Sequence, residues 1–324
     1  MSEFESQGEP GGVSRRGALA VSGGVAGGLL VGAVPLAGAA AAAEHHESKR
    51  GKLPADHIQH ILQAEGTVTN GVLSIDVARN DIGDVQGPRG VTFTPAFEIN
   101  GTLTFQPLKG GRAFFNGDLA LKAEETNPVI DAIIANGLTF QAFHQHYDQM
   151  DAQIWFIHWR GTGAALHVAR AVRKVLAATS TPLPQSMPKH PKTPLNADRL
   201  GKILHGDAMI GDEGVVTVEI SREDNIHIDG IRVSPEANIS TAVEFKPLDR
   251  HGAMAAAAPD FSMTSHEVQP VVALMRRRGW HVGCLYNQET NERPQLYFSH
   301  MIKNGDPYKL AREIRTGLDR THAG

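Results

Sequence analysis

The order of hydrophobic and polar residues predicts that strands and helices follow one another in two similar sets. Alternating strands are expected at 72–79 and at 215–222, because neighbouring side chains on a strand point to opposite faces. Two further strands are expected near 101–107 and 113–122. Runs of strands with helices at their ends are typical of α+β folds, in which helices pack on antiparallel sheets.

Helices are expected at the ends of each set. Short helices are predicted at about 55–64 and 197–205. Another helix begins at Asn127-Pro128, since proline suits the first turn, and ends at Gly137. The closing helices carry apolar residues at helical spacing, which predicts that one side covers a sheet. These residues are Val168, Val172 and Leu176 in the first set, and Leu310, Ile314 and Leu318 in the second.

The two sets are a tandem duplication. At a constant offset of 142 residues, Asp118 matches Asp260 and His158 matches His300. A single offset held over most of the chain indicates an internal repeat, and we predict two α+β halves related by a pseudo-two-fold axis. The predicted organisation is a signal peptide at 1–43, a first repeat at 53–178, a Pro-rich linker at 179–195 and a second repeat at 196–322.

The N-terminal segment is typical of a twin-arginine signal peptide. Arg15 and Arg16 precede a Gly/Ala-rich run that ends in small residues near Ala43, where cleavage is expected. The sequence therefore predicts a secreted or extracytoplasmic protein with no membrane association after cleavage. An uncleaved membrane anchor is the alternative, although the many glycines make this run poorly apolar.

Composition narrows the function classes. The net charge of −4 comes without a sustained basic stripe, which argues against a nucleic-acid partner. Cys284 is the single cysteine, so an internal disulfide is excluded. A small molecule or a peptide remains open as the ligand, and the sequence does not determine the oligomeric state.

Three histidines lie on two neighbouring predicted strands, at 138–143 and 154–159. His144 and His146 are two residues apart, so on a strand their rings share one face, roughly 6–7 Å apart. If the hairpin folds about Asp151, His158 falls opposite His144, and three imidazoles converge.

This arrangement predicts a metal site in the first repeat. We expect His144, His146, His158 and Glu125 to hold one divalent transition metal ion: Zn, Mn, Fe, Ni or Cu. If Glu125 stands off the metal, it is instead the catalytic general base toward a water that the metal activates. The second repeat has Tyr286 and Gln288 in place of the histidine pair, which predicts a degenerate site there.

Arg79 and Asp81 close the first strand of the first repeat and recur as Arg222 and Asp224. One interpretation is a structural ion pair. The other is a substrate-binding pair in which Arg79 faces a carboxylate or phosphate.

These motifs resemble those of the LppY/LpqO family. The resemblance covers roughly 53–322, and it implies a secreted bacterial protein of two repeats without an established activity. The motifs that carry it are Arg79 and Asp81, the segment Glu125, Asn127 and Pro128, the pair His144 and His146, and the pair Phe156 and His158.

The sequence thus predicts an exported metal-binding protein. It is expected either to be a metal-dependent enzyme that acts on a small molecule or peptide, or to bind a metal or ligand outside the cytoplasm without catalysis. A structural or partner-binding module is the third interpretation.

Overall fold

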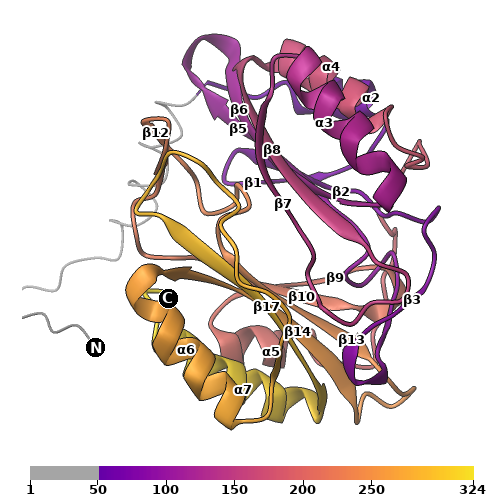
Figure 1. Ribbon diagram of the computed structural model, residues 1–324, viewed down its shortest axis with the longest axis vertical. Helices are drawn as coiled ribbons and strands as arrows, with labels where there is room; N and C mark the ends of the chain where they lie inside the picture. The colour runs from indigo at the N-terminus through magenta and orange to yellow at the C-terminus, as the bar shows by residue number, and fades with distance from the viewer. Residues whose placement is uncertain (1–50) are drawn as a thin grey trace, which may run out of the picture. The chain divides into compact units, whose positions relative to one another are not determined.

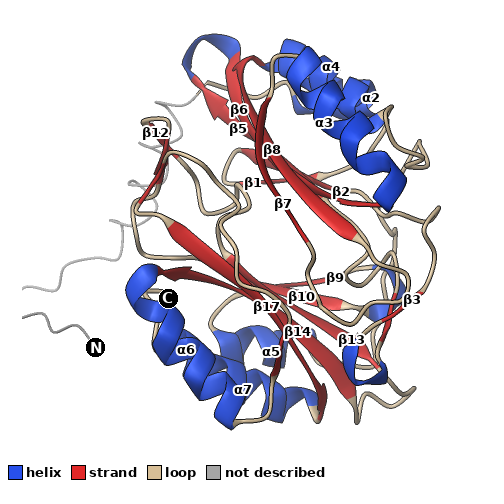
Figure 2. Cartoon of the chain, in the orientation of Figure 1, coloured by secondary structure: helices blue, strands red, loops and turns tan. Residues whose placement is uncertain are grey.

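The structure, a computed structural model, describes residues 51–324 and has the predicted α+β architecture in two similar halves (Figures 1 and 2). The predicted signal peptide at 1–43 lies outside the described residues. Among the residues that are described, no helix is long and apolar enough to span a membrane.

The first half is a six-stranded antiparallel sheet with helices on one face, and its strand order is β1-β2-β5-β6-β8-β7 (Figure 1). Its strands are β1 (Thr67–Thr69), β2 (Val72–Asp76), β5 (Thr102–Leu108), β6 (Arg112–Leu121), β7 (Thr139–His144) and β8 (Trp155–Ala164). Its helices are α2 (Ala55–Leu62), α3 (Thr126–Ala135) and α4 (Ala165–Leu176), with the short turns η1 (Pro88–Gly90), η2 (Lys109–Gly111) and η3 (Ala123–Glu125). The small strands β3 (Val85–Gln86) and β4 (Thr92–Phe93) pair in the loop between β2 and β5.

The second half repeats this plan, with the order β9-β10-β13-β14-β17-β15. Its strands are β9 (Asp207–Ile210), β10 (Val216–Ile220), β13 (Thr241–Pro247), β14 (Ala255–Thr264), β15 (His281–Val282) and β17 (Leu296–Gly305). Its helices are α5 (Ala197–Leu204), α6 (Ser265–Arg277) and α7 (Pro307–Leu318), with the turn η4 (Asp212–Gly214). The short strands β11 (His227–Ile228), β12 (Ile231–Arg232) and β16 (Glu292–Arg293) form a separate three-stranded sheet. The fold class and the tandem repeat are therefore confirmed.

Strand alternation gives each sheet one face toward its helices and one face toward the other half. On β8, Ile157 and Trp159 pack in the core beneath the helices of the first half. Phe156, the residue before Ile157, points to the opposite face and packs in a separate core that also contains Ala256 and Ile302 of the second half. The central strands are consequently buried on both faces, and the polar side chains on their second face lie between the halves.

Loops strengthen this contact by crossing from one half to the other. Phe93 and Phe97, in the loop before β5, pack against residues of β14 and β17. The matching loop of the second half contributes Ile226 and Ile239 to a cluster around Phe114 of β6. The loops that precede β5 and β13 therefore bring side chains of each half to the sheet of the other.

Candidate metal centre

The equivalent histidines of the two repeats lie on the faces that meet between the halves. His158 of β8 is 3 % exposed, and His300 of β17 is 6 % exposed. Strand alternation explains the burial of both histidines, since each lies two residues after a buried phenylalanine, Phe156 or Phe298, and so shares its face. The duplication thus places two histidines in one buried region, although they are 142 residues apart (300 minus 158).

The predicted hairpin register is wrong. His144 pairs with Phe156 instead of His158, and His158 pairs with Ala142; a bulge also interrupts the pairing between Phe140 and Ala142. His158 is nevertheless the diagonal neighbour of His144 on the same face, within reach of a long side chain. The Nε2 atoms of His144 and His158 are 3.0 Å apart.

Another segment holds the tip of this hairpin at Asp151. The backbone N–H of Gln86 donates to the carbonyl of Asp151, and Asp151 N–H donates back to Gln86, both at 2.9 Å. The loop between β7 and β8 is thus tied to β3.

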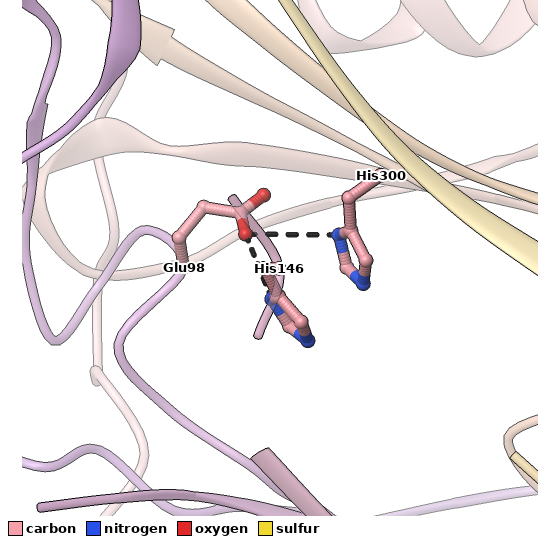
Figure 3. A group of neighbouring side chains, drawn as sticks. All are labelled: Glu98, His146 and His300. Carbon is pink, nitrogen blue, oxygen red and sulfur yellow. Dashed lines mark hydrogen bonds and ion pairs between the residues drawn. The ribbon is translucent and has the colours of Figure 1, made fainter. Parts of the chain in front are cut away.

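A buried group from both repeats has the geometry of a metal site (Figure 3). Glu98, His146 and His300 each offer a ligand atom, and these atoms all lie within 4.8 Å of one another. Glu98 Oε2 is 3.1 Å from His146 Nδ1 and 3.7 Å from His300 Nδ1. All three residues are more than nine-tenths buried. This group can hold a metal ion.

Outer contacts hold these side chains in place. The Tyr147 hydroxyl donates to Glu98 Oε1 at 3.3 Å. Asp260 Oδ2 lies 3.6 Å from His300 Nε2, on the ring edge that faces away from Glu98. The ring of His146 stacks on that of His300, with centroids 3.5 Å apart. A carboxylate behind a ligating imidazole is a common second partner in metal sites, since it fixes the orientation of the ring.

Glu98 has a backbone conformation that few non-glycine residues adopt. Its φ is +71°, in the left-handed region, where a side chain with a Cβ costs about 1 kcal/mol or more. Such residues cluster at functional sites because the surrounding structure holds them there. The sequence analysis missed Glu98, yet its loop Thr94-Pro95-Ala96-Phe97-Glu98 has a counterpart in Ser234-Pro235-Glu236-Ala237-Asn238. A comparison of these two loops is the signal that would have singled out the Glu98 position.

Burial makes the imidazoles of this region neutral. It lowers the pKa of His146 and His300 well below the ordinary value and lowers the pKa of His144 to about 4. Burial, with further contributions from Glu244 and Asp260, raises the pKa of Glu98. Neutral imidazoles keep their lone pairs for a metal, and a cation would take the place of the carboxyl proton of Glu98.

Two imidazoles and one carboxylate suit several divalent transition metals. Catalytic zinc sites use three protein ligands, and non-haem Fe(II) sites use two histidines and a carboxylate, with other coordination positions open. The donor set therefore fits a metal site, and it does not select one metal.

Of the predicted ligands, His144, His146 and His158 come together in this region. Glu125 is engaged elsewhere: it accepts hydrogen bonds from Arg79 at 2.7 Å and from the N–H groups of Lys122 and Ser180. The carboxylate beside the histidines is that of Glu98, because the loop before β5 reaches the other half.

Arg79 is fully buried, and its guanidinium bonds to Asp81, to Glu125 and to the carbonyl of Ala120. This geometry favours the structural ion pair over a substrate-facing arginine. The second repeat has the same network, in which Arg222 bonds to Asp224, Glu267 and the carbonyl of Ser262.

Sequence comparison assigns both halves to one family. Residues 56–178 and 198–320 each match the family described as a domain of unknown function, DUF1259. The chain belongs to the DUF1259 family. Neither a curated protein nor a solved structure matches this DUF1259 protein significantly. The likeness to LppY/LpqO stays a resemblance drawn from the motifs.

Proposed function

We propose that this DUF1259 protein binds one divalent transition metal ion between its two repeats, through Glu98, His146 and His300. The observation that carries the proposal is His300 Nδ1, a buried nitrogen without a hydrogen-bond partner among residues 51–324, which faces Glu98 Oε2 at 3.7 Å. Two ligand atoms bound to one ion at about 2.1 Å each are separated by roughly 3–4 Å, so this spacing suits a bridging ion better than a hydrogen bond.

Elemental analysis of the purified protein, after exposure to zinc or cobalt(II) and desalting, tests the proposal. We expect about one equivalent in the wild-type protein and none in His146→Ala or His300→Ala. His144→Phe keeps an aromatic ring on Tyr286, with which His144 stacks at 3.6 Å between centroids, and is expected to keep the ion. The exposed His167→Ala is the second control.

Equal metal content in the wild-type protein and in both ligand variants would refute this site. Loss of the ion in His144→Phe, with retention in His300→Ala, would instead restore the ligand set predicted from the first repeat alone.

A metal-dependent enzyme that acts on a small molecule or peptide is the second candidate function. Three protein ligands leave coordination positions open for water or substrate. A cavity of about 250 Å³ also reaches Glu244, whose carboxylate accepts the backbone N–H of Glu98 at 3.2 Å. Hydrolysis of small ester or peptide substrates by the loaded protein, absent in His146→Ala, would support catalysis. Metal binding without turnover would favour a non-catalytic extracytoplasmic binding protein.

Export through the twin-arginine pathway belongs to the same proposal. It is supported by Arg15 and Arg16 before the Gly/Ala-rich run, in a segment outside the described residues. Replacing both arginines by lysine is expected to keep the protein in the cytoplasm in a cell-fractionation experiment. Unchanged export of that variant would contradict the assignment.

A further inference from the structure

The loop that carries Glu98 has a structural counterpart in the second repeat. Phe97 N–H donates to the carbonyl of Thr94 at 2.8 Å, and Ala237 N–H donates to that of Ser234 at 2.9 Å. The next residue is left-handed in both loops, with φ of +71° at Glu98 and +62° at Asn238. Asn238 therefore occupies in the second repeat the place that Glu98 occupies in the first.

The histidines are also matched, each with an aspartate beside it. In the sheets, His158 pairs with Asp118, and His300 pairs with Asp260. Asn238 reaches the first of these pairs across the boundary between the repeats, with its Nδ2 3.3 Å from Asp118 Oδ1. This is the same crossing that brings Glu98 to His300.

The two histidines also resemble each other in the surroundings of their Nδ1 atoms. The Nδ1 atoms of His158 and His300 are both buried, and neither has a hydrogen-bond partner in the described part of the chain. The third position differs: His146 of the first repeat corresponds to Gln288 of the second, which donates from its side chain to the carbonyl of Asn238. The Gln288 side chain thus contacts the backbone of residue 238, whereas the His146 ring contacts the side chain of Glu98.

The position around Glu98 and the position around Asn238 lie next to each other, close to the pseudo-two-fold axis that relates the repeats. His144 and Tyr286 are equivalent by the offset of 142 (286 minus 144), and their rings stack at 3.6 Å between centroids. Residues that contact their own equivalents lie close to a two-fold axis. Each position consequently takes its loop residue from one repeat and its strand histidine from the other.

We infer that Asn238, Gln288 and His158 mark the pseudo-symmetric counterpart of the first metal position, which has lost its ion because two amide side chains stand in place of a carboxylate and an imidazole. The inference rests on the proposed function, since it takes Glu98, His146 and His300 as the ligands of the first ion. Glu at 238 and His at 288 restore the donor set for a divalent transition metal such as zinc. The left-handed backbone at 238 accommodates Glu, as the same backbone does at Glu98.

The inference is tested by comparing the zinc content of full-length variants with that of the wild-type protein. Asn238→Glu with Gln288→His is expected to bind one equivalent more than the wild type. Adding His158→Ala to that pair is expected to remove the extra equivalent and no other. The matched control, Asn238→Gln with Gln288→Asn, keeps amides at both positions and is expected to bind as the wild type does.

The single variant Gln288→His serves as a second test in case Glu at 238 prevents folding. It is expected to gain a second site whose affinity for zinc is about ten-fold or more below that of the double variant. This site is also expected to depend on His158. A folded double variant with no more zinc than the wild type would overturn the inference, and so would Gln288→His without extra zinc if the double variant does not fold.

Failure of the proposed function is distinguishable, because it appears as a wild-type protein that binds no zinc. The gain in the double variant, and its loss with His158→Ala, are measured independently of that result.

Discussion

Glu98 combines a left-handed backbone with a buried carboxylate that contacts two imidazoles. The backbone conformation directs the side chain toward the second repeat, where His300 lies. Single residues of this kind escape pattern analysis, because a lone Glu in a loop resembles any surface carboxylate. The histidines were recognisable because three of them fall on predicted strands at spacings that share a face.

The outer partner of His300 yields a prediction at this scale. Asp260→Asn removes the negative charge behind His300 Nε2, and we expect the affinity for zinc to fall by about 10–100-fold. A zinc titration with a competing chelator measures this. Asp118→Asn changes the equivalent aspartate beside His158, where amide side chains stand in place of metal ligands, and is expected to leave the affinity for zinc unchanged. Equal losses in both variants would contradict the distinction between the two positions.

The elements themselves follow from local patterns. Apolar alternation and helical spacing predicted the strands β2, β5, β6 and β10 and the helices α4 and α7 within a few residues. The register of the hairpin β7–β8 was not predictable, because the bulge between Phe140 and Ala142 has no periodic signature and the bonds between Gln86 and Asp151 join segments distant in sequence.

The arginine networks are the element-scale prediction for stability. Arg79→Met leaves Glu125 and Asp81 buried or partly buried without their cation, and we expect the free energy of unfolding to fall by about 3–5 kcal/mol. Urea unfolding followed by circular dichroism measures it. Asp319→Asn, which removes the exposed partner of Arg315 and leaves the bond from Arg315 to the carbonyl of Leu204, is expected to cost less than about 1 kcal/mol. Equal costs would show that Arg79 has no special structural role.

The same network makes stability fall in acid. Burial alone would raise the pKa of Asp81, but hydrogen bonds from Arg79 and Lys122 hold this pKa below the usual 3.8. A carboxylate with a lowered folded-state pKa stabilises the protein above pH 3.8, and this contribution is lost as the pH falls through the folded-state pKa. Asp81→Asn is expected to flatten the acid limb of a plot of unfolding midpoint against pH. An unchanged acid limb would refute the role of Asp81.

For the molecule as a whole, the contact between the repeats decides what is buried. Arg160 of β8 reaches across to the second repeat, where it donates to Asp229 at 2.6 Å and lies 3.5 Å from Glu289. Glu289 is buried, and neither a surface pattern nor a periodicity along its own segment predicts this.

Glu289 gives a pH prediction of the opposite sign. Burial, together with the charge of Glu292, raises its pKa to about 8 in spite of Arg160. The neutral carboxyl therefore favours folding below the ordinary value of 4.5, and this advantage is lost as the pH rises through about 8. Glu289→Gln, neutral at every pH, is expected to be relatively more stable than the wild type at pH 8 than at pH 5 in thermal unfolding. A constant difference between the two proteins across this range would contradict the shift.

The sequence by itself determined the duplication, the α+β class and the residue types of the candidate metal site. These depend on periodicity, on an offset of 142 residues and on histidines near one another in the chain, all of which are local or self-similar features. It did not determine which residues form the candidate metal site. Glu98, His146 and His300 come from two repeats and three segments, and only the packing of one half on the other brings them within 4.8 Å. A contact between distant segments has no periodic signature, so tertiary structure alone decided which histidine faces which carboxylate.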